Sequence, residues 1–334
     1  MQVIQDALAT ADLPHGAVAT IGNYDGLHLG QRALIETVVE RARELSAPAV
    51  VITFEPHPLA VLAPEEAPAR LTTPAQRDAL MAELGVEAVL VIRFTPTFAE
   101  TPARSFVRDF LHERLGVREL YVGSDFSFGH RREGDLSLLR QMGESYGFVA
   151  RSIDEVRRDG ERVSSTRVRA MLRDGRVEEA HELLGRPYAI TGIIARGDRM
   201  GQRLGWPTIN VASDNELLPL DGVYASRVKL ATFPASFESV TNIGTRPTVY
   251  ENYERVVESH ILDFRSDVYG EMVELSFYKR IRDEKMFPST MELSAQIGRD
   301  VESAREYFRA RERFEEGDEA VVGDDSSGFG SSPD

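Results

Sequence analysis

The sequence predicts two domains of different class: an α/β domain with a Rossmann-like parallel sheet, followed by a six-stranded antiparallel β-barrel with a C-terminal helix. Two observations support this prediction. The chain has 334 residues, which is long enough for two domains. Its first half alternates apolar strands with helical patterns, whereas short strands separated by turn residues follow Gly185-Arg186-Pro187. The first pattern is typical of a doubly wound parallel sheet, and the second of a barrel.

The first domain is expected to contain buried strands that alternate with helices. The strands are expected at Ala17–Ile21, Ala49–Phe54, Ala88–Phe94, Leu120–Val122 and Phe148–Ile153. The helices are expected at Arg32–Glu44, after the N-cap Thr73, from Thr101 to Leu115, and at Leu136–Tyr146, Arg167–Arg173 and Val177–Leu184. Ligands bind at the carboxyl ends of parallel strands, so the candidate binding loops are Gly22–Gly30, Glu55–Pro58 and Gly123–Gly129.

The second domain is expected to contain short strands and one long helix. The strands are expected at Tyr188–Ala195, Thr208–Val211, Val223–Leu230, Ser239–Ile243, Val256–Phe264 and Met272–Arg280. The helix is capped near Ser289 and is expected to end at about Glu315. We therefore divide the chain into domains 1–185 and 186–316, followed by an acidic tail, 317–334, whose composition predicts disorder.

The glycine-rich stretch Ile21–Gln31 is the first candidate site. It lies between an apolar strand and a helix start, where backbone N–H groups and the helix dipole favour a phosphate. His28 and Gln31 are three residues apart, so they share a face of the first helical turn. The alternative is a tight strand-to-helix turn with a surface histidine, because a single glycine-rich loop is weakly specific.

The second candidate site lies in the barrel. Thr208 and Asn210 are two apart, so on a strand they point the same way and offer oxygen ligands suited to Mg²⁺ and phosphates. Glu258 stands within an apolar strand, where a carboxylate is costly unless it is paired or acts as a general base. The alternatives are an ordinary polar pair on the wet face of a strand, and a Glu258 that faces water.

Composition excludes several classes of function. The chain has no cysteine, so disulfides and thiolate chemistry are ruled out. Its net charge of −15 argues against a nucleic-acid partner. No apolar run is long enough to span a membrane and no signal peptide is visible, so we expect a cytoplasmic protein with small-molecule substrates.

The motifs of both halves, taken in order, resemble those of the prokaryotic bifunctional riboflavin kinase/FAD synthetases. The resemblance runs from about Val18 to Asp300. In the first domain it rests on Gly22–Gly30, Thr53–Pro58, Gly123–Gly129 and Ser164–Arg169. In the second it rests on Leu204–Asn210, Gly222–Tyr224, Thr241–Thr248 and Glu258–Phe264. Each motif is modestly specific, and the whole series in this order is very specific.

The resemblance implies two reactions and a set of site residues. The first domain would be a nucleotidyltransferase that moves AMP from ATP onto FMN, giving FAD. There, His28 would stabilise charge on the α-phosphate, and Asp125 would line the flavin site. The ATP-binding residues would be Gly22, Asn23, Asp25, Gly30, Gln31, Ser165, Thr166 and Arg167. The barrel would phosphorylate riboflavin with ATP, using Glu258 as catalytic base, Thr208 and Asn210 as Mg²⁺ ligands, and Gly205 in the phosphate loop.

One position departs from the family pattern. The family usually has His-x-Gly-His, and this chain has Gln31 where the second histidine belongs. Glutamine keeps a hydrogen-bond donor but cannot carry a positive charge. A bifunctional enzyme is therefore the main hypothesis. The alternatives are a riboflavin kinase with a weak or silent adenylyltransferase domain, and a non-enzymatic flavin-binding regulator.

Overall fold

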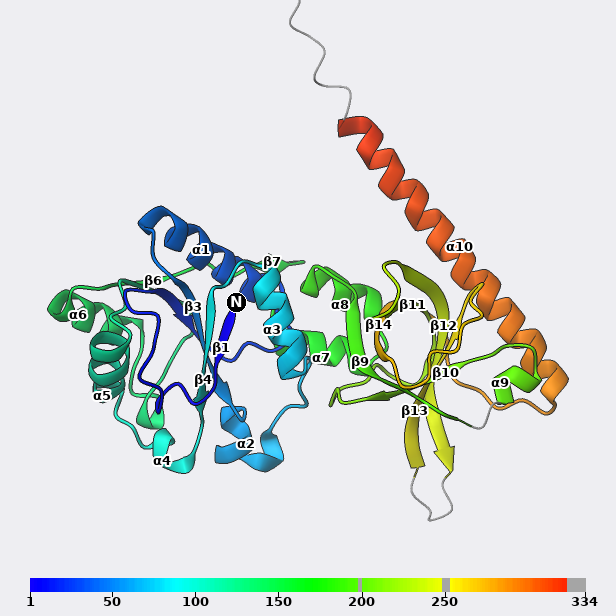
Figure 1. The fold of residues 1–334 in the computed structure, drawn as a ribbon, viewed down its shortest axis with the longest axis horizontal. Helices are drawn as coiled ribbons and strands as arrows, with labels where there is room; N and C mark the ends of the chain where they lie inside the picture. The colour runs from blue at the N-terminus through cyan, green and yellow to red at the C-terminus, as the bar shows by residue number, and fades with distance from the viewer. Residues whose placement is uncertain (198–199, 248–252, 323–334) are drawn as a thin grey trace, which may run out of the picture. The chain divides into compact units, whose positions relative to one another are not determined.

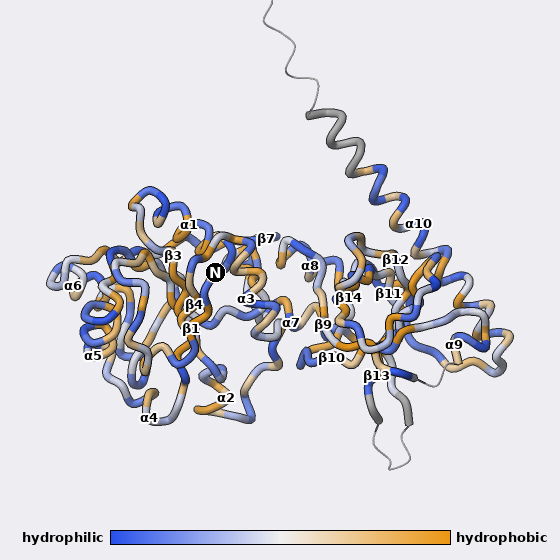
Figure 2. Tube along the Cα trace, in the orientation of Figure 1, coloured by the Kyte–Doolittle hydropathy of each residue, from blue (hydrophilic) through white to orange (hydrophobic). Residues whose placement is uncertain are grey.

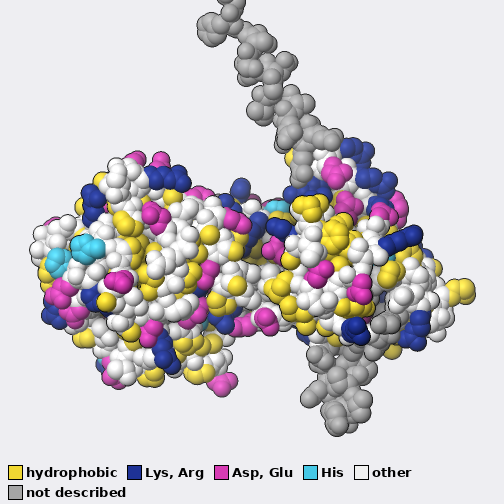
Figure 3. All heavy atoms as spheres, viewed as in Figure 1, with side chains coloured by type: hydrophobic (Ala, Val, Ile, Leu, Met, Phe, Trp, Pro, Cys, Tyr) yellow, Lys and Arg dark blue, Asp and Glu magenta, His cyan; other side chains and the backbone are white. Residues whose placement is uncertain are grey.

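The computed structural model describes residues 1–197, 200–247 and 253–322, which form two compact units (Figure 1). Unit 1 comprises Met1–Ala170, Glu182–Arg186 and Asn215–Leu217, and unit 2 comprises Met171–His181, Pro187–Asp214 and the chain from Leu218 onward. The expected turn residue Asp198, the motif residue Thr248 and tail residues 323–334 lie outside the described part. Acidic and basic side chains intermingle on the face of each unit drawn in Figure 3.

Unit 1 is built on a parallel sheet, as predicted. Its strands are β1 (Gln2–Ile4), β2 (Val18–Ile21), β3 (Ala49–Glu55), β4 (Ala88–Arg93), β5 (Glu119–Val122) and β6 (Val149–Ser152). Their order is β1-β4-β3-β2-β5-β6, and every pairing is parallel. Strand β1 was not predicted, because a three-residue edge strand is too short to show a periodic pattern.

Helices cover both faces of this sheet, which confirms the doubly wound arrangement. On one face, α1 (Leu29–Leu45) and α3 (Pro74–Glu83) pack on Val51 and Val89. On the other, the π-helical η2 (Phe106–Arg114) and α6 (Leu136–Tyr146) pack on Ile52 and Leu90. The apolar strands between them appear as hydrophobic bands in Figure 2.

Shorter elements complete the unit. They are α2 (Pro58–Leu62), η1 (Pro64–Glu66), α4 (Pro96–Ala99), α5 (Ala103–Ser105), η3 (His130–Arg132) and the hairpin of β7 (Arg157–Arg158) and β8 (Glu161–Arg162). The helix expected from Thr101 begins two residues later, because Pro102 takes the N-cap position. The predicted capping box of α3 is present, with Thr73 and Gln76 bonded reciprocally.

The order of the strands in the sheet predicts where a ligand binds. From β2 the chain winds outward through β3 and β4, and it then returns to lay β5 on the other side of β2. The order therefore reverses between β2 and β5, and ligands of doubly wound sheets bind at the carboxyl edge of such a switch point. The loops that leave β2 and β5 there are Gly22–Gly30 and Gly123–Gly129, as predicted.

Unit 2 is a closed antiparallel barrel, which confirms the second fold prediction. Its strands are β9 (Tyr188–Ala195), β10 (Ile209–Ser213), β11 (Gly222–Leu230), β12 (Ser236–Pro247), β13 (Tyr253–Ile261) and β14 (Met272–Arg282). They close in the order β10-β13-β12-β11-β14-β9. A short helix, α9 (Met200–Arg203), lies in the glycine-rich loop before β10.

Three further helices frame the barrel or connect to it. α7 (Ser165–Arg173) and α8 (Val177–Leu184) precede β9, and residues 171–181 belong to unit 2. α10 (Thr290–Val322) packs Val301, Ala304 and Phe308 on Val223 and Val240. It continues beyond the predicted end near Glu315. No helix in the described ranges is both long and apolar enough to cross a bilayer.

Candidate functional site

Unit 1 contains a large cleft at the carboxyl ends of its strands. The cleft has a volume of about 850 Å³, within the range of small-molecule sites. It is lined by the predicted residues Gly22, Asn23, His28, Gly30, Gln31 and Asp125. The structure therefore brings residues of two predicted loops together. The predicted residues Asp25, Ser165, Thr166 and Arg167 are not among those that line it.

His28 ends the glycine-rich loop and is the N-cap of α1. Its Nδ1 accepts a hydrogen bond from the backbone N–H of Gln31 at 3.3 Å. Burial of the ring, helped by the positive charge of Arg162, lowers the pKa of His28 to about 4. The ring is therefore neutral near pH 7 and carries its proton on Nε2. A neutral donor beside the first N–H groups of a helix suits a phosphate oxygen.

The side chain of Gln31 bonds within the glycine-rich loop, and its role toward a phosphate stays a prediction. Its Nε2 donates to the backbone oxygen of Asn23 at 2.9 Å. Its Oε1 is buried and has no hydrogen-bond partner among the described residues. One N–H of the Gln31 amide thus bonds the start of α1 to the glycine-rich loop. The Oε1 atom beside it is an acceptor, and a phosphate, which offers only acceptors, would not satisfy it.

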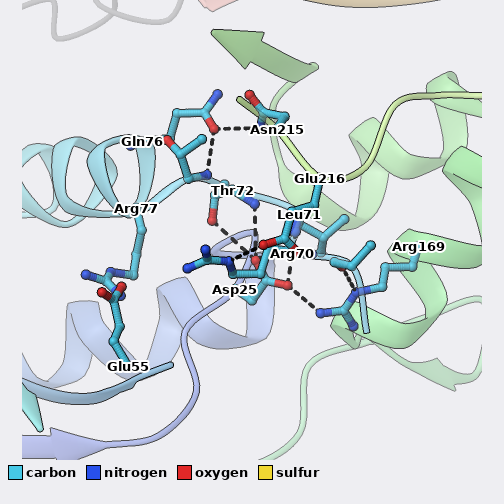
Figure 4. A network of polar contacts seen from close by, with 12 residues as sticks. Asp25, Glu55, Arg70, Leu71, Thr72, Gln76, Arg77, Arg169, Asn215 and Glu216 are labelled. Atoms are coloured by element: carbon cyan, nitrogen blue, oxygen red, sulfur yellow. Dashed lines mark hydrogen bonds and ion pairs between the residues drawn. The ribbon is translucent and has the colours of Figure 1, made fainter. Parts of the chain in front are cut away.

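Asp25 and Ser165 lie behind the glycine-rich loop. The Asp25 carboxylate accepts hydrogen bonds from the backbone N–H groups of Leu71 and Thr72, at 2.9 and 3.1 Å, and pairs with Arg169 (Figure 4). The Ser165 hydroxyl donates to the backbone oxygen of Asp25 at 2.9 Å. These bonds attach the glycine-rich loop to the turn at 69–72 and to α7.

Thr166 and Arg167 lie in the first turn of α7. Thr166 is exposed. The Arg167 guanidinium donates to the backbone oxygens of Arg158 and Glu161, both at 3.3 Å, and pairs with the Glu161 carboxylate at 2.9 Å. Arg167 thus ties α7 to the β7–β8 hairpin, and its role toward a triphosphate stays a prediction.

Asp125 faces the cleft from the loop after β5. Both of its carboxylate oxygens accept hydrogen bonds from Arg162 of β8, each at 2.8 Å. This bidentate pair lowers the pKa of Asp125, mainly through the Arg162 hydrogen bonds. Asp125 is therefore a fixed anion at the cleft, held by the arginine that also bears on the pKa of His28.

The other part of the cleft is aromatic, and sequence reasoning missed it. The lining includes Phe54, Phe94, Phe98, Phe106, Phe126 and Phe128. Phe126 and Phe128 stack with ring centres 5.4 Å apart, and Phe54 meets Phe94 edge-on at 5.9 Å. This aromatic wall, beside the glycine-rich loop, suits a ligand with a planar ring and a phosphate. The available signal was a phenylalanine at or just after the end of β3, β4 and β5.

The barrel carries a row of polar side chains across three strands. Asn210 of β10 pairs with Glu258 of β13, and Glu258 pairs on its other side with Asn242 of β12. Ile209 and Ser259, the flanking residues of the first pair, are buried. Because alternate residues face opposite ways and paired residues share a face, Glu258 lies between two carboxamides. Asn242 was quoted in a motif but not predicted as a site residue, although its place between Thr241 and Ile243 was a signal.

The glycine-rich loop before β10 lies against the predicted phosphate ligands. A Cβ on Gly197 would be 2.4 Å from Nδ2 of Asn210, and one on Gly201 would be 3.1 Å from Oγ1 of Thr208. The loop can approach these side chains so closely only because Gly197 has no side chain. Gly205, at φ +84°, lies at the end of this loop, as predicted.

The end of this loop is anchored. His260 Nδ1 lies 2.7 Å from the backbone oxygen of Pro207, and Trp206 donates through Nε1 to the hydroxyl of Ser294, on α10, at 3.0 Å. The rings of Trp206 and His260 also meet edge-on. These contacts fix the segment that leads into Thr208.

The oxygen atoms of this site fit a magnesium ion that arrives with a nucleotide. Within the described ranges, no three His, Cys, Asp or Glu side chains are grouped so as to hold a metal ion. The Thr208 hydroxyl and the Asn210 amide offer hard oxygen ligands two positions apart in the sequence. Mg²⁺ usually keeps several waters and is bound by few protein groups together with substrate phosphates. We therefore expect a Mg²⁺ site in which the protein supplies only a few of the ligands.

Comparison with known proteins gives concordant results for the two units. A family model of FAD synthetase matches residues 10–167, and one of riboflavin kinase matches residues 184–308. The bifunctional riboflavin kinase/FMN adenylyltransferase of Escherichia coli (strain K12) is 44% identical over 293 residues, covering 88% of this chain and 93% of that protein. The protein of the same name from Haemophilus influenzae is 35% identical over 310 residues, covering 93% of this chain and 100% of that protein.

A solved structure matches the fold over most of the chain. It bears the name macrolide-efflux protein, from Streptococcus pneumoniae, and superposes with a TM-score of 0.82 at 28% identity. The match covers 91% of this chain and 99% of that chain. The likeness therefore includes residues of both units.

Proposed function

This chain belongs to the family of bifunctional riboflavin kinase/FMN adenylyltransferases, and on that premise we propose how its residues divide the work. The enzyme phosphorylates riboflavin to FMN with ATP, and it adenylylates FMN to FAD with release of pyrophosphate. We assign the adenylyltransferase to domain 1–185 and the kinase to domain 186–316, since each half carries its own set of candidate site residues. ATP as co-substrate of both steps favours a cytoplasmic location.

In the kinase step, Glu258 is the general base. Its carboxylate takes the proton from the terminal ribityl hydroxyl of riboflavin as that oxygen attacks the γ-phosphorus of ATP, and ADP leaves. Asn210 and Asn242 flank Glu258 in the strand register and orient the carboxylate and the hydroxyl. Thr208 and Asn210 hold Mg²⁺, which when bound neutralises phosphate charge. The loop from Gly197 to Gly205 covers the phosphates.

In the adenylyl transfer step, a phosphate oxygen of FMN attacks the α-phosphorus of ATP, and the bond to the pyrophosphate oxygen breaks. His28 donates its Nε2–H to the phosphate oxygens as they gain charge. The backbone N–H groups at the start of α1 and the glycine-rich loop around Gly22 and Gly30 hold the nucleotide. The aromatic wall receives the flavin ring, beside Asp125.

The observation that carries this proposal is the coexistence of two candidate sites in one chain. Unit 1 places His28 at a helix N-terminus in a cleft, and unit 2 places Glu258 in register with Asn210. The test is to incubate the protein with riboflavin, ATP and Mg²⁺ and to separate the flavins chromatographically. Formation of FAD supports the proposal, FMN alone indicates a kinase, and unchanged riboflavin contradicts both and indicates a flavin-binding regulator.

A kinase with a weak adenylyltransferase domain is the second candidate, and the state of Gln31 favours it. The amide of Gln31 bonds to Asn23 within the loop, and unlike a second histidine it cannot bring a positive charge to the phosphates. A slow second step would make FMN accumulate before FAD in the same assay. The ratio of the two products over time therefore separates the candidates.

A further inference from the structure

The Asp25 carboxylate is the centre of a buried network behind the glycine-rich loop (Figure 4). Asp25 is 7% exposed. Its oxygens accept hydrogen bonds from the backbone N–H groups of Leu71 and Thr72, and one of them pairs with the Arg169 guanidinium. All of these groups belong to unit 1. The carboxylate is therefore satisfied by the protein itself.

The Arg169 side chain is also buried and bonded within unit 1. It is 7% exposed, and besides Asp25 it donates through Nε to the backbone oxygen of Ala69 at 2.7 Å. Its position on α7 is 144 residues from Asp25 in the chain. Removing one partner of such a buried pair leaves an uncompensated charge, which is far more disruptive than removing both. The pair thus joins α7, the turn at 69–72 and the glycine-rich loop.

Further bonds hold the same loop from two sides. The Gly26 N–H donates to Oγ1 of Thr72 at 3.2 Å, and the Arg186 guanidinium donates to the backbone oxygens of Gly26 and Leu27, at 2.7 and 3.2 Å. A Cβ on Gly26 would lie 2.7 Å from the Leu71 side chain, so the loop lies tightly against this turn. These contacts leave the loop little freedom.

The loop is held in a strained conformation immediately before the active histidine. Leu27 has φ +42° and is 1% exposed. A leucine in the left-handed region is disfavoured because its Cβ crowds the following carbonyl oxygen, and it persists only when its surroundings enforce it. Leu27 directly precedes His28, so relaxing Leu27 would turn the imidazole and the first N–H groups of α1 away from their present direction.

We propose that Asp25 and Arg169 form a positioning pair for adenylyl transfer. The pair holds the strained Leu27 so that His28 faces the nucleotide. Neither side chain contacts ATP or its metal. This inference rests on the proposed adenylyltransferase function. It reassigns Asp25 from phosphate binding to support of the loop.

The test compares Asp25→Asn, Arg169→Gln and the double variant in the full chain. Each single variant should lower kcat/KM for adenylyl transfer by about 10²-fold, because a displaced catalytic group of this kind costs about that much. The double variant should lose clearly less than the product of the two single losses, since it leaves no unpaired charge. Kinase turnover in the same chains should be unchanged, which shows that the substitutions leave unit 2 intact.

Two controls separate positioning from general destabilisation and from metal binding. Glu119→Gln removes a carboxylate of unit 1 that is also 7% exposed and is paired with Arg41 at the amino end of β5, far along the strand from the cleft. It should lower the thermal midpoint with little effect on adenylyl transfer. The Mg²⁺ concentration that gives half-maximal adenylyl transfer should be the same in Asp25→Asn and in the natural protein.

A readout that does not depend on catalysis completes the test. Amide hydrogen exchange of residues 22–31 should become faster in Asp25→Asn and return toward the natural rate in the double variant. The proposal is overturned by multiplicative losses in the double variant, by a shifted Mg²⁺ requirement, or by loop exchange that stays unchanged. If the natural protein makes no FAD, the proposed function fails, and the exchange measurement still decides whether the pair holds the loop.

Discussion

The phosphate loops of the two units are held in place by different means. In unit 1, Asp25 and Arg169, which are far apart in the sequence, fix the loop from behind through a buried ion pair. In unit 2, the strand register aligns Asn210 with Glu258. The glycines of the loop before β10 let its backbone approach Asn210 and Thr208 closely. The first arrangement depends on long-range partners, whereas the second follows from local alternation along strands. Substitutions should therefore act on the two activities separately.

The largest separation is expected from Glu258→Gln. Removing the base of the kinase step should lower FMN formation from riboflavin by about 10²–10⁴-fold, with little loss of riboflavin binding. Adenylylation of FMN supplied from outside should stay unchanged. The two rates are measured on the same preparation. Kinase turnover near that of the natural protein would show that another group takes the proton.

The mirror experiment is His28→Ala. It removes the Nε2 donor, and the loss of one such donor typically lowers kcat by about 10²–10³-fold, so FAD formation should fall while FMN formation continues. His28→Asn is the matched control, because asparagine keeps an N-cap acceptor for α1 but lacks the ring donor. Both variants should lose adenylyl transfer, and only His28→Ala should also lower the thermal midpoint. Retained FAD synthesis in both would place the catalytic group elsewhere.

A smaller change, in the opposite direction, is expected from Gln31→His. A histidine here could carry a positive charge beside the triphosphate, and charge-assisted hydrogen bonds are roughly twice as strong as neutral ones. Adenylyl transfer should rise about tenfold for each 1.4 kcal/mol gained, with kinase turnover unaffected. Product formation from FMN and ATP measures this. Flat or lower FAD formation would mean that Gln31 is an adequate substitute.

The smallest expected effect is the response of adenylyl transfer to pH. The pKa of His28 is lowered from 6.5 to about 4, mainly by burial, so the ring stays neutral from pH 6 to 8. The Nε2 proton that we assign to catalysis is present throughout that range, so titration of His28 should add no limb to kcat/KM for ATP near pH 6.5. A limb there that vanishes in His28→Asn would indicate a protonated His28 in the free enzyme.

The lowered pKa of His28 also makes the stability of unit 1 depend on pH. Because the folded state holds His28 neutral, the unfolded chain binds more protons between about pH 4 and pH 6.5. Folding of unit 1 should therefore lose stability as the pH falls through that range. His28→Asn should show a weaker loss over the same range, measured by denaturant unfolding at each pH.

Features set by neighbouring residues could be predicted from the sequence, and features set by distant partners could not. The parallel sheet, the barrel and the α3 capping box were predictable, because strand periodicity and capping residues act over a few positions. The direction of the Asp25 carboxylate was not, because its partner Arg169 is 144 residues away. The bond from the Gln31 amide to the Asn23 backbone was not predictable either, because it depends on the shape of the folded loop.

The barrel site was closer to the prediction. Thr208 and Asn210 were chosen because residues two apart on a strand share a face, and the structure places Asn210 beside Glu258. Asn242 was not chosen, because its place between Thr241 and Ile243 was a signal but only the pairing of β12 with β13 shows that it meets Glu258. The aromatic wall was missed for a similar reason, as its members come from separate loops that only the sheet order brings together.

The most direct test of the central claim, that each activity has its own site and residues, is complementation in a mixture. Glu258→Gln alone and His28→Ala alone should make almost no FAD from riboflavin, ATP and Mg²⁺. An equimolar mixture of the two should make FAD, because FMN formed and released by His28→Ala is adenylylated by Glu258→Gln. If the mixture makes no FAD although each variant keeps its remaining activity, the two sites do not work independently and the account is contradicted.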